Sequence, residues 1–113
     1  MIYNYKVLII GSNGFIGFYL TQFLKKICNV KTISRKNADY NFDIINKNKL
    51  RKIIDLFDPN IIFYTAAIVD IEIAEENKNY TNIINALIPI FISKIIKKSV
   101  KLVYFSSIAV YPN

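Results

Sequence analysis

Short apolar runs alternate along the chain with segments in which apolar residues recur at the 3.6-residue spacing of a helix. The runs are rich in β-branched residues and predict strands. The helical spacing predicts amphipathic helices between these strands. Strands are expected at residues 5–10, 30–34, 61–65 and 102–106, with a short one near 41–44, and helices at 15–27, 47–57, 70–77 and 80–98.

This alternation predicts an α/β domain with a doubly wound parallel sheet, flanked by helices on both faces and connected by right-handed crossovers. The length of 113 residues fits one such domain, residues 1–113. The chain ends just after its last predicted strand, which leaves an apolar edge uncovered. We therefore expect a truncated fold, the N-terminal part of a longer one. The alternatives are a minimal domain that stands alone and a homo-oligomer that pairs these edges.

Three local signals refine the predicted helices. Asn46 is expected to cap the N-terminus of the helix that follows it. Pro89 lies inside the last predicted helix, where it should remove one hydrogen bond and bend the axis. In the first helix, the 3.6-residue spacing predicts an apolar face made by Ile16, Leu20, Phe23, Leu24 and Ile27.

The composition is that of a globular protein, with 53% hydrophobic and only 20% charged residues. No apolar stretch reaches the roughly 18 residues that a membrane-spanning helix needs. The first residues do not resemble a secretory signal, because the apolar run after them enters a glycine turn. We expect a cytoplasmic protein with no membrane partner.

Charge and metal-binding residues exclude several classes of function. Cys28 is the only cysteine and the chain has no histidine, so an intrachain disulfide, a histidine-dependent triad and a His-ligated metal site are excluded. The eight carboxylates are scattered, and no metal site is expected. The net charge of +7 suits an anionic partner. The lysines form no dense tract with interleaved aromatics, so an anionic small molecule accounts for the charge equally well, and no nucleic-acid partner is expected.

All three glycines lie in the stretch GSNGFIG, between the first strand and the first helix. Gly11 is expected to form the tight turn, and Gly14 to leave room for a pyrophosphate at the helix N-terminus, where the helix dipole favours an anion. Gly17 would let the helix pack close to the strand. The spacing G-x-x-G-x-x-G differs from the usual G-x-G-x-x-G, and a purely structural turn is the alternative. The intervening residues predicted to bind the cofactor are Ser12, Asn13, Phe15 and Ile16.

The residues after the second strand bear on the choice of cofactor. An acid there would bind the ribose 2′-hydroxyl of NAD, whereas a basic or hydroxyl residue accommodates the 2′-phosphate of NADP. This chain has Ser34 and Arg35 followed by Lys36, and no acid before Asp39. An arginine forms a charge-assisted bidentate contact with a phosphate. We expect NADP, with NAD as the alternative; an exposed loop that happens to be basic would explain the same residues.

Four further motifs follow in order: FDI at 42–44, YTAA at 64–67, NAL at 85–87 and FSSIAVY at 105–111. Together with GSNGFIG they resemble the extended short-chain dehydrogenases/reductases, a family with a Rossmann-type sheet whose members act on nucleotide sugars. The resemblance covers nearly the whole chain. The stretch AAIVDIEIAEEN with NALIP is similar to the dTDP-4-dehydrorhamnose reductases, whereas SSIAVYP is similar to the epimerase/dehydratase and fucose-synthase branches.

The resemblance implies roles for individual residues. Asp43, followed by Ile44 in the same motif, would accept a hydrogen bond from the adenine amino group. Ala66 and Ala67 would let the backbone run beside the cofactor. Asn85 matches a residue that is structural or part of a proton relay in the family. The alternative for Asp43 is an ordinary turn or capping residue.

The catalytic group implied by the resemblance is incomplete in this chain. Ser107 matches the family's catalytic hydroxyl and Ser106 its neighbour at the cofactor, although serine often ends a strand at a loop. The family's proton-carrying tyrosine lies four residues before a lysine. Seven of the eight tyrosines have another residue at that position, and Tyr111 lies too near the end to have one. We expect the cofactor-binding part of an NAD(P)-dependent oxidoreductase or epimerase acting on nucleotide-linked sugars, inactive alone; the alternative is a non-catalytic dinucleotide-binding or regulatory module.

Overall fold

The computed structural model of the chain describes residues 4–68 and 71–105. The strands form one parallel sheet in the order β3-β2-β1-β4-β5, so the predicted α/β class with a doubly wound sheet is confirmed. The strands are β1 (Lys6–Ile10), β2 (Asn29–Ser34), β3 (Tyr40–Asn41), β4 (Ile61–Tyr64) and β5 (Lys101–Tyr104). The helices are α1 (Phe15–Leu24), α2 (Lys47–Phe57), α3 (Ile71–Glu76), α4 (Lys78–Asn82), the π-helix η1 (Ile83–Leu87) and α5 (Ile88–Ile95).

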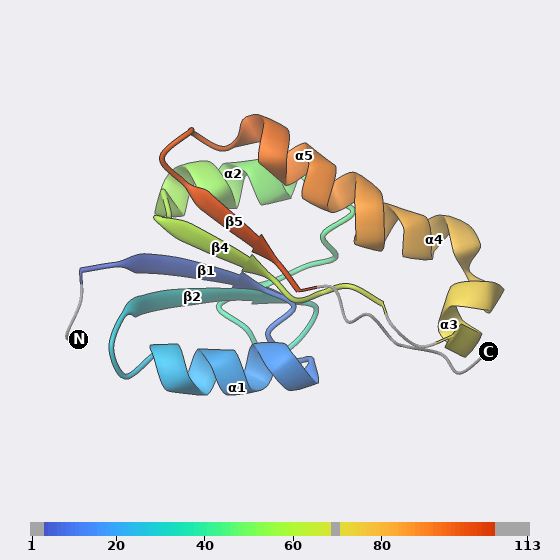
Figure 1. The fold of residues 1–113 in the computed structure, drawn as a ribbon, viewed down its shortest axis with the longest axis horizontal. Coiled ribbons are helices and arrows are strands. Elements are labelled where there is room, and N and C mark those ends of the chain that lie inside the picture. The colour runs from blue at the N-terminus through green and yellow to red at the C-terminus, as the bar shows by residue number, and fades with distance from the viewer. Residues whose placement is uncertain (1–3, 69–70, 106–113) are drawn as a thin grey trace.

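Helices cover both faces of the sheet, with α1 on one face and α2 and α5 on the other (Figure 1). In β1, Leu8 and Ile10 pack toward the core shared with α2 and α5, while Val7 and Ile9 pack toward α1. All four side chains are buried. A strand covered on both faces needs no polar alternation, which explains the continuous apolar run of β1.

The predicted apolar face of α1 is confirmed in part: Leu20, Leu24 and Ile27 pack against the buried residues Val7, Ile9, Cys28 and Val30, whereas Ile16 and Phe23 do not. Phe23 is 65% exposed and Ile16 is 42% exposed, whereas Gly17 and Thr21 are the buried residues of this helix. The helix approaches the sheet most closely through the small residues Gly17 and Thr21, while Leu20 and Leu24 are partly buried against the sheet. The Thr21 hydroxyl donates a hydrogen bond to the Gly17 carbonyl at 2.6 Å, which satisfies this buried polar group within the helix.

The predicted N-cap of α2 is confirmed: the Asn46 side chain accepts a hydrogen bond from the Lys49 backbone N–H at 3.2 Å. The helix ends at Asp58, which has a positive φ of 51° and forms the left-handed cap. Most other boundaries differ from the prediction by one to three residues, since helix and strand ends depend on contacts that periodicity does not encode. The short strand expected at 41–44 occupies Tyr40–Asn41, and the predicted ends at Asp70 and Ser106 lie outside the described residues.

The long helix predicted at residues 80–98 is three segments, α4, η1 and α5, and Pro89 lies in the first turn of α5. The Ile88 N–H bonds to the Ile83 carbonyl, five residues back, and Pro89 has no N–H to donate. The carbonyls of Ile84 and Asn85 instead accept hydrogen bonds from two tyrosine hydroxyls, those of Tyr64 in β4 and Tyr104 in β5. The two tyrosine hydroxyls therefore tie the interrupted helix to the sheet, at carbonyls four and five residues before Pro89.

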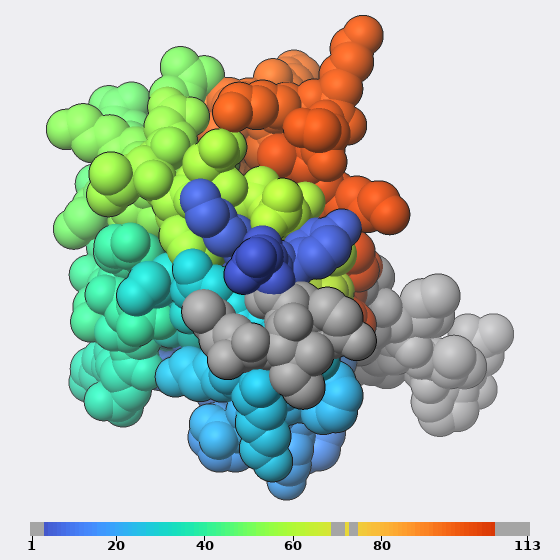
Figure 2. Space-filling model, turned by 90° about the vertical axis from the view of Figure 1, so that its left-hand side faces the viewer, coloured from blue at the N-terminus to red at the C-terminus, as the bar shows by residue number. Residues whose placement is uncertain are grey.

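The two ends of the sheet differ in character. Figure 2 shows the end at which the strands begin, with the dark blue start of β1 at the centre, the blue of α1 below it and the orange of α5 and β5 above it. The opposite ends of the strands meet the glycine turn and the loops that follow β2 and β4. In open parallel sheets ligands bind at these carboxyl ends, beside the point where the strand order reverses. Here that point lies between β1 and β4.

Two absences concern the described part of the chain only. Within residues 4–68 and 71–105, no helix combines the length and hydrophobicity needed to cross a membrane. The same residues contain no group of three or more histidine, cysteine or acidic side chains placed to hold a metal ion.

Candidate functional site

Two glycines of the GSNGFIG stretch are required by the fold itself, Gly11 in the turn after β1 and Gly17 in α1. Gly11 has a φ of +92°, and a Cβ on it would lie 2.7 Å from the backbone of Ala66. A Cβ on Gly17 would lie 2.3 Å from the Gly11 carbonyl oxygen and 2.7 Å from the Thr65 hydroxyl. Both distances are shorter than any real Cβ contact, so no side chain fits at either position.

Gly14 differs from the other two glycines. It caps α1 with a φ of −73°, a value that any residue adopts. A Cβ there would meet the Gly11 carbonyl oxygen at 3.5 Å and the Thr65 carbonyl oxygen at 4.0 Å, which are ordinary van der Waals contacts. The fold does not require glycine at this position, whereas a ligand that approaches the backbone closely would.

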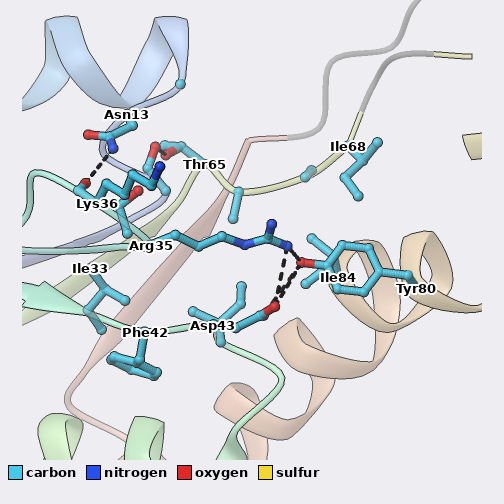
Figure 3. Close-up of a pocket in the computed structure, with 16 residues that line it drawn as sticks. Asn13, Ile33, Arg35, Lys36, Phe42, Asp43, Thr65, Ile68, Tyr80 and Ile84 are labelled. Atoms are coloured by element: carbon cyan, nitrogen blue, oxygen red, sulfur yellow. Dashed lines mark hydrogen bonds and ion pairs between the residues drawn. The ribbon is translucent and has the colours of Figure 1, made fainter. Parts of the chain in front are cut away.

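Gly14 borders a cavity of about 490 Å³ at the carboxyl ends of the strands. The cavity lies between the glycine turn, the loop after β2, the segment before α2 and the segment after β4 (Figure 3). Several residues predicted from the sequence to bind a cofactor line it. These are Gly11, Asn13, Gly14, Ser34, Arg35, Asp43, Ile44, Ala66 and Ala67.

Arg35 extends across this cavity from the end of β2 (Figure 3). One guanidinium nitrogen lies 3.3 Å from the Asp43 carboxylate and donates a hydrogen bond to the Tyr80 hydroxyl. The guanidinium carbon lies 5.4 Å from the centre of the Tyr80 ring, within cation–π range. The Tyr80 hydroxyl lies 3.3 and 3.5 Å from the two Asp43 carboxylate oxygens. We call these three side chains the Arg35 cluster.

Asp39 does not lie among the residues of the cavity. Its carboxylate accepts hydrogen bonds from the Thr32 backbone N–H at 2.9 Å and from the Thr32 hydroxyl at 3.0 Å, so it points back along β2. The cavity wall at the end of β2 is therefore built by Ser34, Arg35 and Lys36. The Asn13 side-chain amide donates to the Lys36 carbonyl and ties this basic loop to the glycine turn.

The segment after β4 is held in place by two polar side chains. The Thr65 hydroxyl lies 2.9 Å from the carbonyl oxygens of both Ile10 and Gly11 and so fastens β4 to the start of the glycine turn. Asn85 accepts a hydrogen bond from the Ile68 N–H at 2.6 Å and donates one to the Ile68 carbonyl at 2.8 Å. Asn85 thus positions the wall of the cavity and is not among the residues that line it.

The other predicted site residues lie away from the cavity. Ser12 is buried and borders a separate hollow beside α1. Phe15 is 81% exposed, Ile16 lies on the exposed side of α1, and Gly17 is enclosed in the packing of α1 against the sheet. Ser106 and Ser107 lie outside the described residues.

Six residues that line the cavity were not predicted from the sequence: the polar residues Thr65 and Tyr80 and the apolar residues Ile33, Phe42, Ile68 and Ile84. Thr65 lies inside the YTAA stretch, where only the two alanines were singled out. Tyr80 reaches Asp43 from a helix 37 residues further along the chain. The hydroxyl of a tyrosine near the start of a predicted helix carries no local signal for such a contact.

The reversal of strand order beside a glycine turn, with a cavity at the carboxyl ends of the strands, defines a Rossmann-type α/β domain. The model of the NAD dependent epimerase/dehydratase family matches residues 7–113. The chain belongs to this family, in agreement with the resemblance to extended short-chain dehydrogenases/reductases. No curated protein sequence matches the chain.

Solved structures share this fold. L-threonine 3-dehydrogenase from Trypanosoma brucei superimposes with a TM-score of 0.82 at 18% identity, over 96% of this chain and 38% of that one. UDP-glucose 4-epimerase from Brucella ovis, in complex with NAD, gives 0.79 at 18% identity, over 98% and 38%. dTDP-4-dehydrorhamnose reductase from Bacillus anthracis, in complex with NADP, gives 0.69 at 24% identity, over 80% and 31%. The chain thus spans between 31% and 38% of the length of these structures.

Proposed function

We propose that this chain binds a nicotinamide dinucleotide in the cavity at the carboxyl ends of the strands. The observation that carries the proposal is the glycine at position 14. The fold does not require a glycine there, but a pyrophosphate that approaches the N-terminus of α1 would. In this arrangement Ala66 and Ala67 line the path of the cofactor, and Asp43 faces its adenine end. Membership of the family, and neighbours in complex with NAD or NADP, support the same class of ligand.

The site offers this ligand what its chemistry needs. The N-terminus of α1 presents free backbone N–H groups and the positive end of the helix dipole, which stabilise a pyrophosphate. Lys36 and Arg35 add positive charge at the end of β2. The nicotinamide ring supplies hydride transfer when the cofactor is bound. This chain's own contribution is to hold, orient and partly enclose the cofactor.

We further propose NADP as the preferred cofactor. Asp39, the first acid after β2, is engaged by Thr32 and does not border the cavity, so no carboxylate stands ready for a ribose 2′-hydroxyl at this point. Arg35 supplies a guanidinium for a 2′-phosphate instead.

The purified chain is expected to bind NADPH more tightly than NADH when both are titrated by nucleotide fluorescence at fixed salt. Replacing Arg35 with aspartate should lower the ratio of NADPH affinity to NADH affinity by about tenfold or more. The 2′-phosphate loses its charge-assisted hydrogen bonds with the guanidinium and is repelled by the new carboxylate. Lys26→Asp, at an exposed position in the turn after α1 and not among the residues that line the cavity, makes the same change in net charge and serves as the control. Equal affinities, or tighter binding of NADH to the unaltered chain, would contradict the assignment of NADP.

For the whole reaction we propose an NAD(P)-dependent oxidoreductase or epimerase acting on a nucleotide-linked sugar, with these residues as its cofactor-binding part. Ser107 is proposed to help hold the reacting oxygen, as the resemblance implies. The second candidate is a non-catalytic dinucleotide-binding or regulatory module, which would use the same cavity to bind the cofactor. Assays with nucleotide-linked ketosugars separate the two only in a protein that also supplies the Tyr-x-x-x-Lys pair; turnover by the chain alone would show that another group carries the proton.

A further inference from the structure

The Arg35 cluster closes the adenine side of the cavity. Its three side chains come from three separate parts of the chain: the loop after β2, the segment before α2, and α4 (Figure 3). Both oxygens of the Asp43 carboxylate have partners: one accepts the Ile45 N–H at 3.2 Å, the other pairs with Arg35, and the Tyr80 hydroxyl lies within reach of both. An adenine amino group directed at Asp43 therefore meets a carboxylate that is already paired.

The arginine itself also occupies the space. Its side chain runs through the cavity, between the segment after β4 on one side and Phe42 and Asp43 on the other (Figure 3). A base placed beside Asp43 has to displace the guanidinium from both Asp43 and Tyr80. Since the Arg35 side chain is 64% exposed and that of Asp43 is 34% exposed, this pairing is weak enough to be broken by a ligand.

A phosphate monoester is a stronger partner for a guanidinium than a single carboxylate oxygen, because it offers more negative charge and a matching fork of acceptors. We propose that Arg35 is a selective latch: it blocks Asp43 against dinucleotides with a free ribose 2′-hydroxyl, and a 2′-phosphate draws it away and frees Asp43 for the adenine. The inference rests on the proposed dinucleotide site. It assigns Tyr80 as a positioning residue that holds the latch closed.

A latch and a simple phosphate-binding arginine lead to different expectations for the affinity of the chain for NADH. If Arg35 only attracts the 2′-phosphate, removing it weakens NADPH binding and leaves NADH unchanged. If Arg35 also blocks Asp43, removing it tightens NADH binding as well. Selectivity would then come from exclusion of one cofactor as much as from attraction of the other.

The test titrates NADH and NADPH into four forms of the chain at fixed salt: unaltered, Arg35→Met, Lys36→Met and Tyr80→Phe. Arg35→Met should tighten NADH about 2- to 5-fold, the range of an exposed ion pair, and weaken NADPH about tenfold or more. Lys36→Met removes the same charge from the same loop, and among the described residues its side chain has no ion pair or hydrogen bond with Asp43 or Tyr80. NADH binding by Lys36→Met should therefore not tighten.

Tyr80→Phe keeps the ring and the net charge but removes the hydroxyl that joins Arg35 to Asp43. It should tighten both cofactors, about 2- to 3-fold, because the latch opens more easily while the phosphate-binding arginine remains. Unchanged or weaker NADH binding in Arg35→Met, or weaker binding of both cofactors in Tyr80→Phe, would overturn the latch. Failure of the unaltered chain to bind either cofactor would instead overturn the proposed function. Circular dichroism confirms that each variant is folded.

Discussion

Replacing Gly14 with valine is expected to abolish NADPH binding while the chain keeps its fold. The Cβ finds room in the protein, with its nearest neighbour at 3.5 Å, but the branched side chain projects into the space that the pyrophosphate would fill. A loss of at least about 100-fold in affinity is expected, which corresponds to about 2.7 kcal/mol. The cost to stability should stay near 1 kcal/mol, because only the N-cap of α1 changes.

Fluorescence titration measures the affinity, and circular dichroism with thermal unfolding measures the fold. Phe18→Val is the matched control, since it places the same side chain at an exposed position of the same helix. The control should bind NADPH as the unaltered chain does. Normal binding by Gly14→Val would mean that the pyrophosphate does not approach this glycine and that the proposed site is misplaced.

Gly17→Ala is expected to have the opposite signature, a large loss of stability. A single methyl group at this position would lie 2.3 Å from the Gly11 carbonyl oxygen, which is backbone and has nowhere to move without shifting α1 away from β1. Overpacking of this kind costs about 1–3 kcal/mol or more, and the contact here is close enough to favour the upper end. Urea unfolding monitored by circular dichroism gives the free energy directly.

The control for this experiment is Gly14→Ala, which adds the same methyl group three residues earlier. Its Cβ makes only ordinary contacts, so its stability should lie within about 1 kcal/mol of the unaltered chain. If Gly17→Ala were as stable as Gly14→Ala, the close packing of α1 on the sheet would be incorrect. The pair of variants thus separates a glycine needed by the fold from one needed by a ligand.

The periodicity of the sequence was a sound guide wherever local rules decide the structure. The apolar run of β1 and the cap at Asn46 were predicted because strand burial and capping depend on neighbouring residues. The face of α1 was predicted only in part: Leu20 and Leu24 pack on the sheet as expected, but the spacing also points to Phe23, which is exposed, while close packing selects Gly17, whose side chain is absent. A hydrophobicity pattern does not predict a close helix–strand contact that depends on the absence of a side chain.

Individual residues of the candidate site could be predicted from the sequence, but the contacts between them could not. The glycine turn, Arg35 and Asp43 were each identified from the sequence, with separate partners expected for the last two. The structure brings Arg35 and Asp43 to each other, together with Tyr80 from α4. Contacts between residues so distant in the chain depend on the sheet order and on the path of α4, which no local pattern specifies.

The tyrosine hydroxyls that bind the interrupted helix imply covariation between positions that are distant in the sequence. The carbonyls of Ile84 and Asn85 accept hydrogen bonds from the hydroxyls of Tyr64 and Tyr104, and the Asn85 carbonyl is the one that an N–H at position 89 would bond in an α-helix. A relative with an ordinary residue in place of Pro89 regains the N–H and can exchange Tyr104 for phenylalanine at little cost, whereas a relative that keeps the proline cannot. Pro89 and Tyr104 should therefore be inherited and lost together, so that the pair is recognisable from aligned sequences as covariation between a helix and the strand after it.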